Sequence, residues 1–290
     1  MKSQSDCCIF NGRLIAAGTP VAPVTSRGLM YGDGIFETFR SYSGRSLLLA
    51  EHLDRLKTGL ECLEINRPPG LEIKSVECMV RTLLQEKKLL ERDAIVRLQV
   101  WREGSRGYIP DINSPSHFSI IATECPDTFS CPKIVTVNRR RVPEEALPSC
   151  YKLTNSINYI LASREAEQKG GDDALMQTVD NWVSETTLGN IFWIKNETIF
   201  TPSKQCDLLP GITRKIVIEL ILQNDLWKIR QGKFLPDHVM NAESVFITNS
   251  VRELLAVKQV DKQYFDVGNH VYKTIRDRFI NFRNAHLQTL

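Results

Sequence analysis

The chain has 290 residues, enough for one large or two modest domains, and its 42% hydrophobic and 24% charged residues are those of an ordinary globular protein. Its 37 basic and 34 acidic residues leave a net charge of +3, which is too weak to argue for nucleic acid as a partner. The N-terminus lacks the apolar core of a secretory signal, and no window approaches the roughly 18 apolar residues of a membrane span. Eight cysteines without a C-x-x-C pair favour reduced thiols, so a cytoplasmic protein that does not contact the membrane is expected.

The first part of the chain alternates strand and helix patterns. Residues 7–18 and 34–49 are predicted to be strands with glycine turns. In residues 51–65, leucines recur at positions 53, 56, 60 and 63, which is the spacing of an amphipathic helix. A second helix is predicted after the Pro-Pro-Gly break at 68–70, and strands over 94–104 and 117–126 complete a small α+β unit.

The second part begins after residues 124–133, which contain two prolines and little periodicity and are predicted to be a linker. Helices are expected within 149–171, after Gly211 and over 270–288. Strands are expected over 133–138, 173–179, 190–196, 198–203 and 244–250. The predicted organisation is therefore α+β, with a small domain at 1–123 and a larger one at 134–290.

The stretch MYGDGIFETFR, residues 30–40, has two glycines in the G-x-G spacing of a dinucleotide-binding loop. That fingerprint requires a third small residue at position 37 and a helix directly behind it. Position 37 is glutamate, and the residues that follow are aromatic and typical of a strand. The pattern therefore predicts a turn that leads into a strand, and it argues against a dinucleotide.

Two other features predict no site. The five histidines are scattered without metal-ligand spacing, so a metal site is not expected. The run Arg139-Arg140-Arg141 is the one local excess of charge, and it is interpreted as a solvated loop before Pro143.

Three features of the second half of the sequence are candidates for a cofactor site: the start of a helix, a carboxylate and an amine. Gly211 opens an apolar helix with Thr213 in its first turn, and N–H groups at such an end favour phosphate. Glu185 lies between two apolar strands, where a buried unpaired carboxylate would be costly, so its side chain is expected either to face water or to have a specific partner. Lys152 precedes a helix and is followed by Asn155. Pyridoxal phosphate needs a lysine for its Schiff base, a carboxylate for its ring nitrogen and a phosphate site, although each feature alone carries little weight.

Nearly the whole chain resembles the class IV, fold-type IV pyridoxal-phosphate enzymes, in the segments YGDGIFETFR, EHLDRL, YKLTNSINYILASREA, DDALMQTVDNWVSETTLGNIFWIK, TPSKQCDLLPGITRKIVIEL and ESVFITNS. That family includes branched-chain and D-amino-acid aminotransferases and aminodeoxychorismate lyase. The resemblance implies a small α/β N-terminal domain, a larger C-terminal domain with a barrel-like sheet, and pyridoxal 5'-phosphate as cofactor. It also implies small-molecule amino-acid and 2-oxo-acid substrates and a homodimer.

The resemblance also implies roles for individual residues. Lys152 is expected to form the Schiff base and to move the substrate proton. Glu185 is expected to bind the pyridine nitrogen, with Asn190 behind it. The implied phosphate contacts are Arg55, Gly211, the backbone N–H groups of Ile212 and Thr213, Asn249 and Ser250.

The substrate-side residues leave two activities open. Arg106 and Tyr108 resemble the carboxylate-binding Arg and His of D-amino-acid aminotransferases and, more closely, the Gly-Arg-Gly-Tyr run of aminodeoxychorismate lyases, although Glu103 stands where a glycine is expected. Tyr31 and Phe36 are implied to line the pocket. An amino-acid aminotransferase is favoured, and the alternative is a lyase that releases p-aminobenzoate and pyruvate. A non-catalytic relative that only binds cofactor or a partner would be expected to lack the lysine or the glutamate, and both are present.

Overall fold

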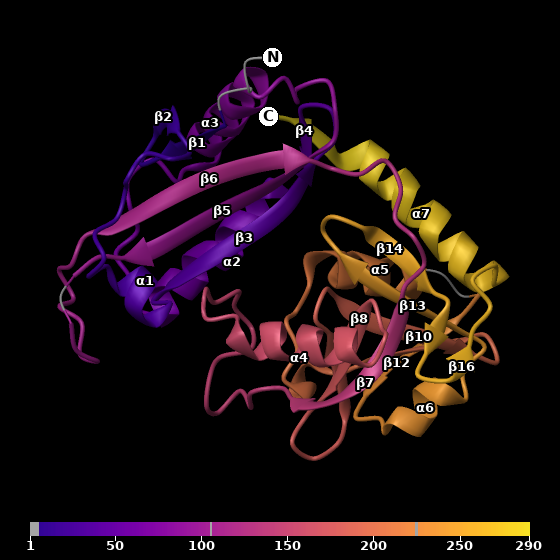
Figure 1. The fold of residues 1–290 in the computed structure, drawn as a ribbon. Coiled ribbons are helices and arrows are strands. Elements are labelled where there is room, and N and C mark those ends of the chain that lie inside the picture. The colour runs from indigo at the N-terminus through magenta and orange to yellow at the C-terminus, as the bar shows by residue number, and fades with distance from the viewer. Residues whose placement is uncertain (1–5, 105, 224–225) are drawn as a thin grey trace. The chain divides into compact units, whose positions relative to one another are not determined.

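The computed structural model describes residues 6–104, 106–223 and 226–290, and the chain divides into two compact units (Figure 1). The first unit comprises Met1–Asp127, Tyr151–Asn155 and His286–Leu290, and the second comprises Thr128–Cys150 and Ser156–Ala285. The first division falls inside the stretch predicted as a linker. The sequence placed residues 151–155 and 286–290 in the large domain, whereas in the structure both segments return to the first unit.

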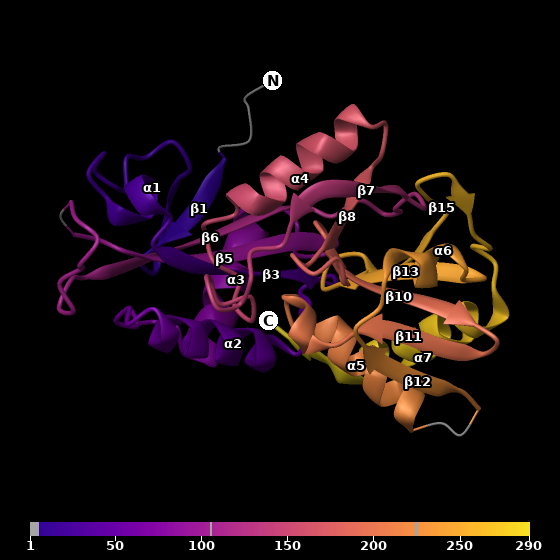
Figure 2. The same cartoon turned by 90° about the horizontal axis from the view of Figure 1, so that it is seen from below.

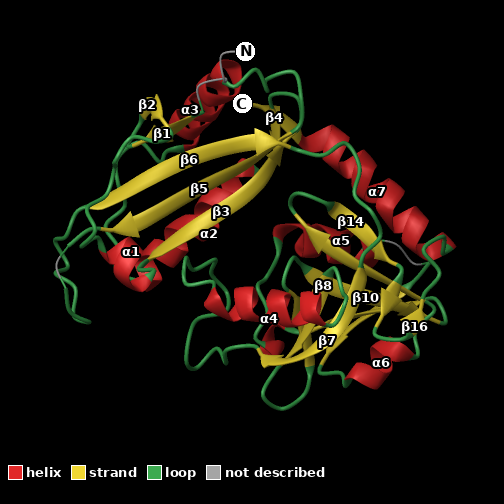
Figure 3. Cartoon of the chain, in the orientation of Figure 1, coloured by secondary structure: helices red, strands yellow, loops and turns green. Residues whose placement is uncertain are grey.

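The first unit is built on a seven-stranded sheet in the order β17-β4-β3-β5-β6-β1-β2. Figure 3 shows β3, β5 and β6 side by side as its long strands. The central strands β3, β5 and β6 pair antiparallel along nearly their full lengths. The strands are β1 (Cys7–Phe10), β2 (Arg13–Ala16), β3 (Gly34–Ser41), β4 (Arg45–Leu47), β5 (Ala94–Arg102), β6 (Ser116–Glu124) and β17 (Leu287–Thr289). The helices are α1 (Arg27–Tyr31), α2 (Leu49–Cys62) and α3 (Ile73–Glu86).

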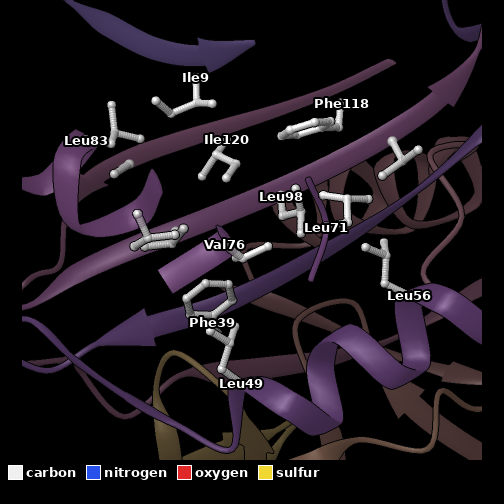
Figure 4. Packing of buried hydrophobic residues seen from close by; sticks show 14 of the residues in the cluster. Ile9, Phe39, Leu49, Leu56, Leu71, Val76, Leu83, Leu98, Phe118 and Ile120 are labelled. Carbon is white, nitrogen blue, oxygen red and sulfur yellow. The ribbon is translucent and has the colours of Figure 1, made fainter. Parts of the chain in front are cut away.

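The core of this unit lies between the sheet and helices α2 and α3 (Figure 4). Because side chains alternate along a strand, every second residue of the central strands joins that core. The residues between them, which include Phe36, Arg97 and Gln99, therefore face the other side of the sheet. The core side chains include Ile9, Phe39, Leu56, Leu60, Val76, Leu83, Leu98, Phe118 and Ile120.

The second unit contains two five-stranded sheets, ordered β12-β11-β10-β13-β14 and β16-β15-β7-β8-β9. Helix α4 (Ile157–Gln168) packs on β7 and β8 (Figure 2), while α5 (Ile212–Leu222) contacts β12 and β13. The first sheet contains β10 (Asn190–Lys195), β11 (Thr198–Pro202), β12 (Lys228–Gly232), β13 (Ser244–Asn249) and β14 (Glu253–Val257). The second contains β7 (Lys133–Arg140), β8 (Asp173–Gln177), β9 (Val183–Thr186), β15 (Gln259–Val260) and β16 (Gln263–Tyr264). The remaining helices are η1 (Lys204–Cys206), α6 (Pro236–Met240) and α7 (His270–His286).

The five longer helices predicted from the sequence are confirmed as α2, α3, α4, α5 and α7. The stretch around MYGDG differs in one respect, because a short helix, α1, precedes the turn. Gly32 ends this helix with φ 65°, a left-handed conformation that glycine adopts at little cost. Its N–H donates to the carbonyl of Gly28, and β3 begins two residues later at Gly34. The predicted strand is thus confirmed. In the described part of the chain, no helix is both long enough and apolar enough to cross a bilayer.

One histidine in the second unit predicts a pH-dependent stability. His238 packs against Phe200 and Phe234, and its Nδ1 accepts a hydrogen bond from Nε1 of Trp193 at 3.0 Å. Burial lowers the pKa of His238 below its usual 6.5. The unfolded chain therefore takes up the proton at higher pH than the folded chain does. The contribution of neutral His238 to the free energy of unfolding is lost as the pH falls below about 6.5. We expect the thermal midpoint to fall by about 2 °C more in the wild type than in His238→Gln between about pH 7.5 and pH 5.5.

A thermal-unfolding series at both pH values checks this expectation. His270 provides a matched control because its side chain is 73% exposed, so His270→Gln is expected to keep the wild-type dependence on pH. If the thermal midpoint of His238→Gln falls as much as that of the wild type, His238 is not the source of the pH dependence.

Candidate active site

Lys152 lies in an extended segment that pairs with one edge of β3. The N–H of Phe36 donates to the carbonyl of Lys152 at 2.9 Å, and the N–H of Thr154 donates to the carbonyl of Gly34 at 2.9 Å. Strand β4 pairs with β3 only near the far end of that strand, so this edge is available to the segment. The carbonyl of the lysine and the N–H two residues after it are therefore bonded to β3 of the first unit.

The lysine amine and an arginine share one aromatic ring. Nζ of Lys152 lies 4.8 Å from the ring centroid of Phe36, and Cζ of Arg97 lies 3.6 Å from the same centroid. Arg97 donates from Nε and Nη2 to Oε1 of Gln99, and burial lowers the pKa of its guanidinium. Among the described residues no carboxylate forms an ion pair with Arg97. A partly buried guanidinium in this setting favours an anionic ligand beside the amine. Sequence reasoning missed Arg97, although an arginine in the middle of a mostly apolar strand was a signal.

The opposite face of β3 carries a buried ion-pair cluster. Glu37, 1% exposed, accepts hydrogen bonds from Nε and Nη2 of Arg55 at 2.7 and 2.8 Å. Nδ1 of His52 lies 2.7 Å from Oε2 of the same carboxylate. Although burial opposes its charge, the hydrogen bonds and positive charge of Arg55 lower the pKa of Glu37 to about 2. Arg55 is thus held by a bidentate ion pair, and its contact with a phosphate stays a prediction.

Glu185 on β9 is 3% exposed, and polar groups from several elements contact its carboxylate. The hydroxyl of Tyr159 donates to Oε1 at 2.8 Å. Nδ2 of Asn190 and the N–H of Leu209 donate to Oε2, each at 3.2 Å. Nε of Arg141 lies 3.5 Å from Oε1. These groups offset the cost of burying a negative charge, so of the two alternatives predicted for Glu185 the structure has the buried carboxylate with specific partners.

Arg141 corrects the interpretation of the arginine run as a solvated loop. Its side chain is 6% exposed, Nε donates to the carbonyl of Asp207 at 2.9 Å, and Cζ lies 4.4 Å from the ring centroid of Tyr159. Arg139 is exposed, and Arg140 is partly buried at the end of β7. The run therefore passes from the surface to the Glu185 carboxylate within three residues.

The start of α5 is tied to the same carboxylate. Gly211 is the N-cap of this helix, and no described side chain caps it, so its first N–H groups point to a ligand or to water. Ile212 and Thr213 in the first turn are 8% and 4% exposed. Asn190, which donates to Glu185, also donates to the carbonyl of Leu209 at 2.8 Å. The helix start has the character of a phosphate site, and the phosphate contact itself stays a prediction.

Gly211→Ala is expected to destabilise the second unit by about 1–2 kcal/mol. A Cβ at this position would lie 2.3 Å from Oδ1 of Asn190, and Asn190 cannot turn away without losing its bonds to Glu185 and Leu209. The measurement is the free energy of unfolding in denaturant. Gly18→Ala serves as the control, because a Cβ there meets no atom within 4 Å. Equal values for both variants would contradict this packing.

Asn249 and Ser250 lie at the turn between β13 and β14. Oδ1 of Asn249 accepts from the N–H groups of Val251 and Arg252 at 2.9 and 2.7 Å. Its Nδ2 donates to the carbonyl of Leu188 at 2.9 Å. The Asn249 side chain therefore links this turn to the loop before β10, while the phosphate contacts of Asn249 and Ser250 stay predictions.

The residues predicted to bind the substrate carboxylate lie on an exposed loop of the first unit. Arg106 is exposed, and Tyr108 is 91% exposed; Ser105, which precedes them, lies outside the described residues. The loop is held at Gly107, whose carbonyl accepts from Nη1 of Arg27 at 2.6 Å and whose N–H donates to the Tyr31 hydroxyl at 3.0 Å. Tyr31 thus holds this loop, and the substrate contacts of Tyr31, Phe36, Arg106 and Tyr108 stay predictions.

Comparison with known proteins decides the family. The family model of amino-transferase class IV matches residues 34–260, a span that contains Lys152, Glu185 and the start of α5. The chain belongs to the class IV aminotransferases.

Curated relatives of this class IV aminotransferase carry more than one activity in their names. A putative branched-chain-amino-acid aminotransferase of Methanocaldococcus jannaschii is 31% identical over 280 residues, covering 94% of this chain and 95% of that protein. An aminodeoxychorismate lyase of Bacillus subtilis is 27% identical, covering 87% of this chain and 86% of that protein.

Solved structures share its fold. A branched-chain aminotransferase of Thermoproteus uzoniensis, crystallised with norvaline, superposes with a TM-score of 0.88 at 21% identity and covers 98% of this chain and 99% of that one. An aminotransferase of Brucella abortus bound to pyridoxal phosphate superposes with a TM-score of 0.86 at 22% identity, covering 96% of this chain and 99% of that one. The predicted fold-type IV architecture is confirmed.

Pyridoxal phosphate is the cofactor of this family, and the residues of this class IV aminotransferase fit it. The first unit contains the amine of Lys152, and the second contains the carboxylate of Glu185 and the uncapped start of α5, which are the kinds of group that this cofactor requires. The donors around Glu185 suit an ionised carboxylate, which is the form that holds a protonated ring nitrogen. Across the residues that the structure describes, no group of His, Cys, Asp and Glu side chains could hold a metal ion.

Proposed function

We propose that this enzyme moves an amino group from an amino acid to a 2-oxo acid, with Lys152 as the residue that binds the cofactor and moves the substrate proton. The observation that carries the proposal is the pairing of Lys152 and Arg97 on the ring of Phe36. It places an amine next to a cation suited to a carboxylate, which both an amino acid and a 2-oxo acid contain.

Each of these side chains has a part in the proposed reaction. Bound pyridoxal phosphate supplies an electron sink that makes the α-carbon proton of the substrate acidic. Nζ of Lys152 takes that proton and returns it, because the extended backbone along β3 keeps the amine beside Phe36. Arg97, over the same ring as the amine, orients the substrate through a carboxylate.

The lyase remains the second candidate because of one specific feature. This feature is the Arg-Gly-Tyr sequence at 106–108, which resembles the lyase pattern. As a separate observation, the Bacillus subtilis lyase is 27% identical to this chain. The higher identity of 31% with a putative branched-chain aminotransferase supports amino transfer.

A substrate panel separates the two activities. Purified protein receives L- and D-amino acids with 2-oxoglutarate in one series, and 4-amino-4-deoxychorismate in another. We expect amino transfer with at least one amino acid and no release of p-aminobenzoate. Release of p-aminobenzoate without amino transfer would overturn the proposal and establish the lyase.

Assembly as a homodimer is also part of the proposal, and a cytoplasmic setting stays a prediction. Tyr108, Ile109 and Ile112 on the loop after β5 are 91%, 94% and 62% exposed. Side chains of this size are commonly covered by a partner, and a second copy of the chain is the partner that the resemblance implies. Sedimentation analysis tests the dimer, and a monomer at micromolar concentration would refute it.

A further inference from the structure

Tyr159 is a phenol that the proposed reaction does not use, and it lies at the start of α4 against the Glu185 carboxylate. Its ring packs on the apolar cluster formed by β7, β8 and α4, and its hydroxyl donates to Oε1 of Glu185 at 2.8 Å. Burial and the nearby negative charge of Glu185 raise the pKa of Tyr159 well above its usual 10. The hydroxyl therefore stays protonated and acts as a donor throughout the working pH range.

Arg141 fixes the plane of this phenol. Its Cζ lies 4.4 Å from the Tyr159 ring centroid, within the range of a cation–π contact. The guanidinium is anchored on two sides, because Nε donates to the carbonyl of Asp207 at 2.9 Å and Nη1 donates to Oδ1 of Asn158 at 3.2 Å. Asn158 in turn donates to the carbonyl of Arg140 at 2.9 Å. Arg141 is thus a fixed charge that holds the ring of Tyr159.

The two oxygens of Glu185 are held from different parts of the unit. Oε2 accepts from Asn190 on β10 and from the backbone of Leu209 before α5. Oε1 accepts from Tyr159 on α4 and lies 3.5 Å from Nε of Arg141. Because a carboxylate rotates about one bond, donors on both oxygens fix its orientation better than donors on one.

We propose that Tyr159, held in place by Arg141, is a positioning residue that orients the Glu185 carboxylate toward the ring nitrogen of the cofactor. The inference rests on the proposed role of Glu185 as the partner of that nitrogen. Without the hydroxyl, Oε1 loses its short donor, the carboxylate turns more easily, and its bond to the cofactor ring weakens.

The test compares the rate at which the holoenzyme releases pyridoxal phosphate. Tyr159→Phe keeps the ring, its packing and its contact with Arg141, and removes only the hydroxyl. We expect release to become about 5-fold faster, the effect of losing one hydrogen bond to a charged group whose other donors remain. Tyr272→Phe is the matched control, because Tyr272 is also buried in the second unit and, among the described residues, its hydroxyl bonds only the backbone of Leu254 and Ala256.

A double-mutant cycle shows whether Tyr159 acts through Glu185. Release is followed by the loss of bound absorbance in the presence of an excess of scavenger apoenzyme, for the wild type, Tyr159→Phe, Glu185→Gln and the double variant. We expect the effect of Tyr159→Phe to disappear in the Glu185→Gln background, since the hydroxyl then has no carboxylate to orient. A general loss of packing would instead change release equally in both backgrounds.

Three results would overturn the inference. They are equal release from the wild type and Tyr159→Phe, an unchanged effect in the Glu185→Gln background, and an effect of the same size in Tyr272→Phe. A wild-type protein that takes up no cofactor would instead refute the proposed function itself. Thermal midpoints of all variants, measured in parallel, identify any variant that has lost its fold.

Discussion

Lys152→Ala is expected to remove the yellow absorbance of the purified enzyme and to lower amino transfer by about 10⁴-fold or more. The substitution removes both the amine that binds the cofactor and the group that moves the substrate proton, and proton transfer alone contributes about 10²–10⁴-fold. In the first unit, no other lysine shares the ring of Phe36 among the contacts of the described residues. The visible spectrum and the rate of amino transfer are the two measurements.

The fold is expected to survive this change. The segment around Lys152 is held by backbone bonds to Phe36 and Gly34, which do not involve the lysine side chain. The thermal midpoint should therefore stay within about 2 °C of the wild-type value. Lys57→Ala is the control, because the Lys57 side chain is 57% exposed on α2. A yellow and active Lys152→Ala enzyme would refute the assignment of the lysine.

The spacing of apolar residues predicted those helices and strands whose hydrophobic pattern lies within one continuous stretch of the sequence. The leucines of residues 51–65 place one stripe on α2, and Leu56 and Leu60 lie in the core as that stripe requires. The alternation of β3 and β5 likewise separates the core residues from Phe36 and Arg97. These are local properties, so the sequence contains them in full.

The position of Lys152 could not be predicted in this way. Its segment pairs with β3 across more than a hundred residues of chain, and its own pattern shows no strand alternation. The pairing depends on an open strand edge, which exists because β4 contacts β3 at its far end only. Sheet order determines that edge, and sheet order is a property of the whole unit.

Arg141 shows why the burial of a charged residue was harder to predict than the burial of an apolar one. An arginine run is usually solvated, and nothing in its composition distinguishes Arg141 from its two neighbours. Its burial depends on Glu185 and Tyr159, which reach it from β9 and α4. For Glu185, the apolar strands on either side predicted a side chain that either faces water or has a specific partner, and the fold decides for the partner and identifies it.

Glu37→Gln is expected to lower the free energy of unfolding of the first unit by about 3 kcal/mol at neutral pH. Breaking a buried ion pair by removing the charge of one member leaves the other without compensation, which costs about 3–5 kcal/mol. Arg55 and His52 both face this carboxylate, whose side chain is 1% exposed. Denaturant unfolding at neutral pH measures the change. Glu61→Gln, at a 63% exposed position of α2, is expected to change it by less than about 0.5 kcal/mol.

The same cluster makes the first unit sensitive to acid. The pKa of Glu37 is lowered from 4.5 to about 2 in the folded chain, mainly by Arg55 against the opposing effect of burial. The stabilisation that ionised Glu37 gives to the folded chain is therefore complete above its pKa in the unfolded chain. It is lost as the pH falls from about 4.5 toward 2, by about 3 kcal/mol in total. Glu37→Gln has no such group to protonate, so its curve should approach the wild-type curve as the pH falls. Parallel curves for the two proteins from neutral pH down to about pH 3 would contradict an ionised Glu37 in the folded state.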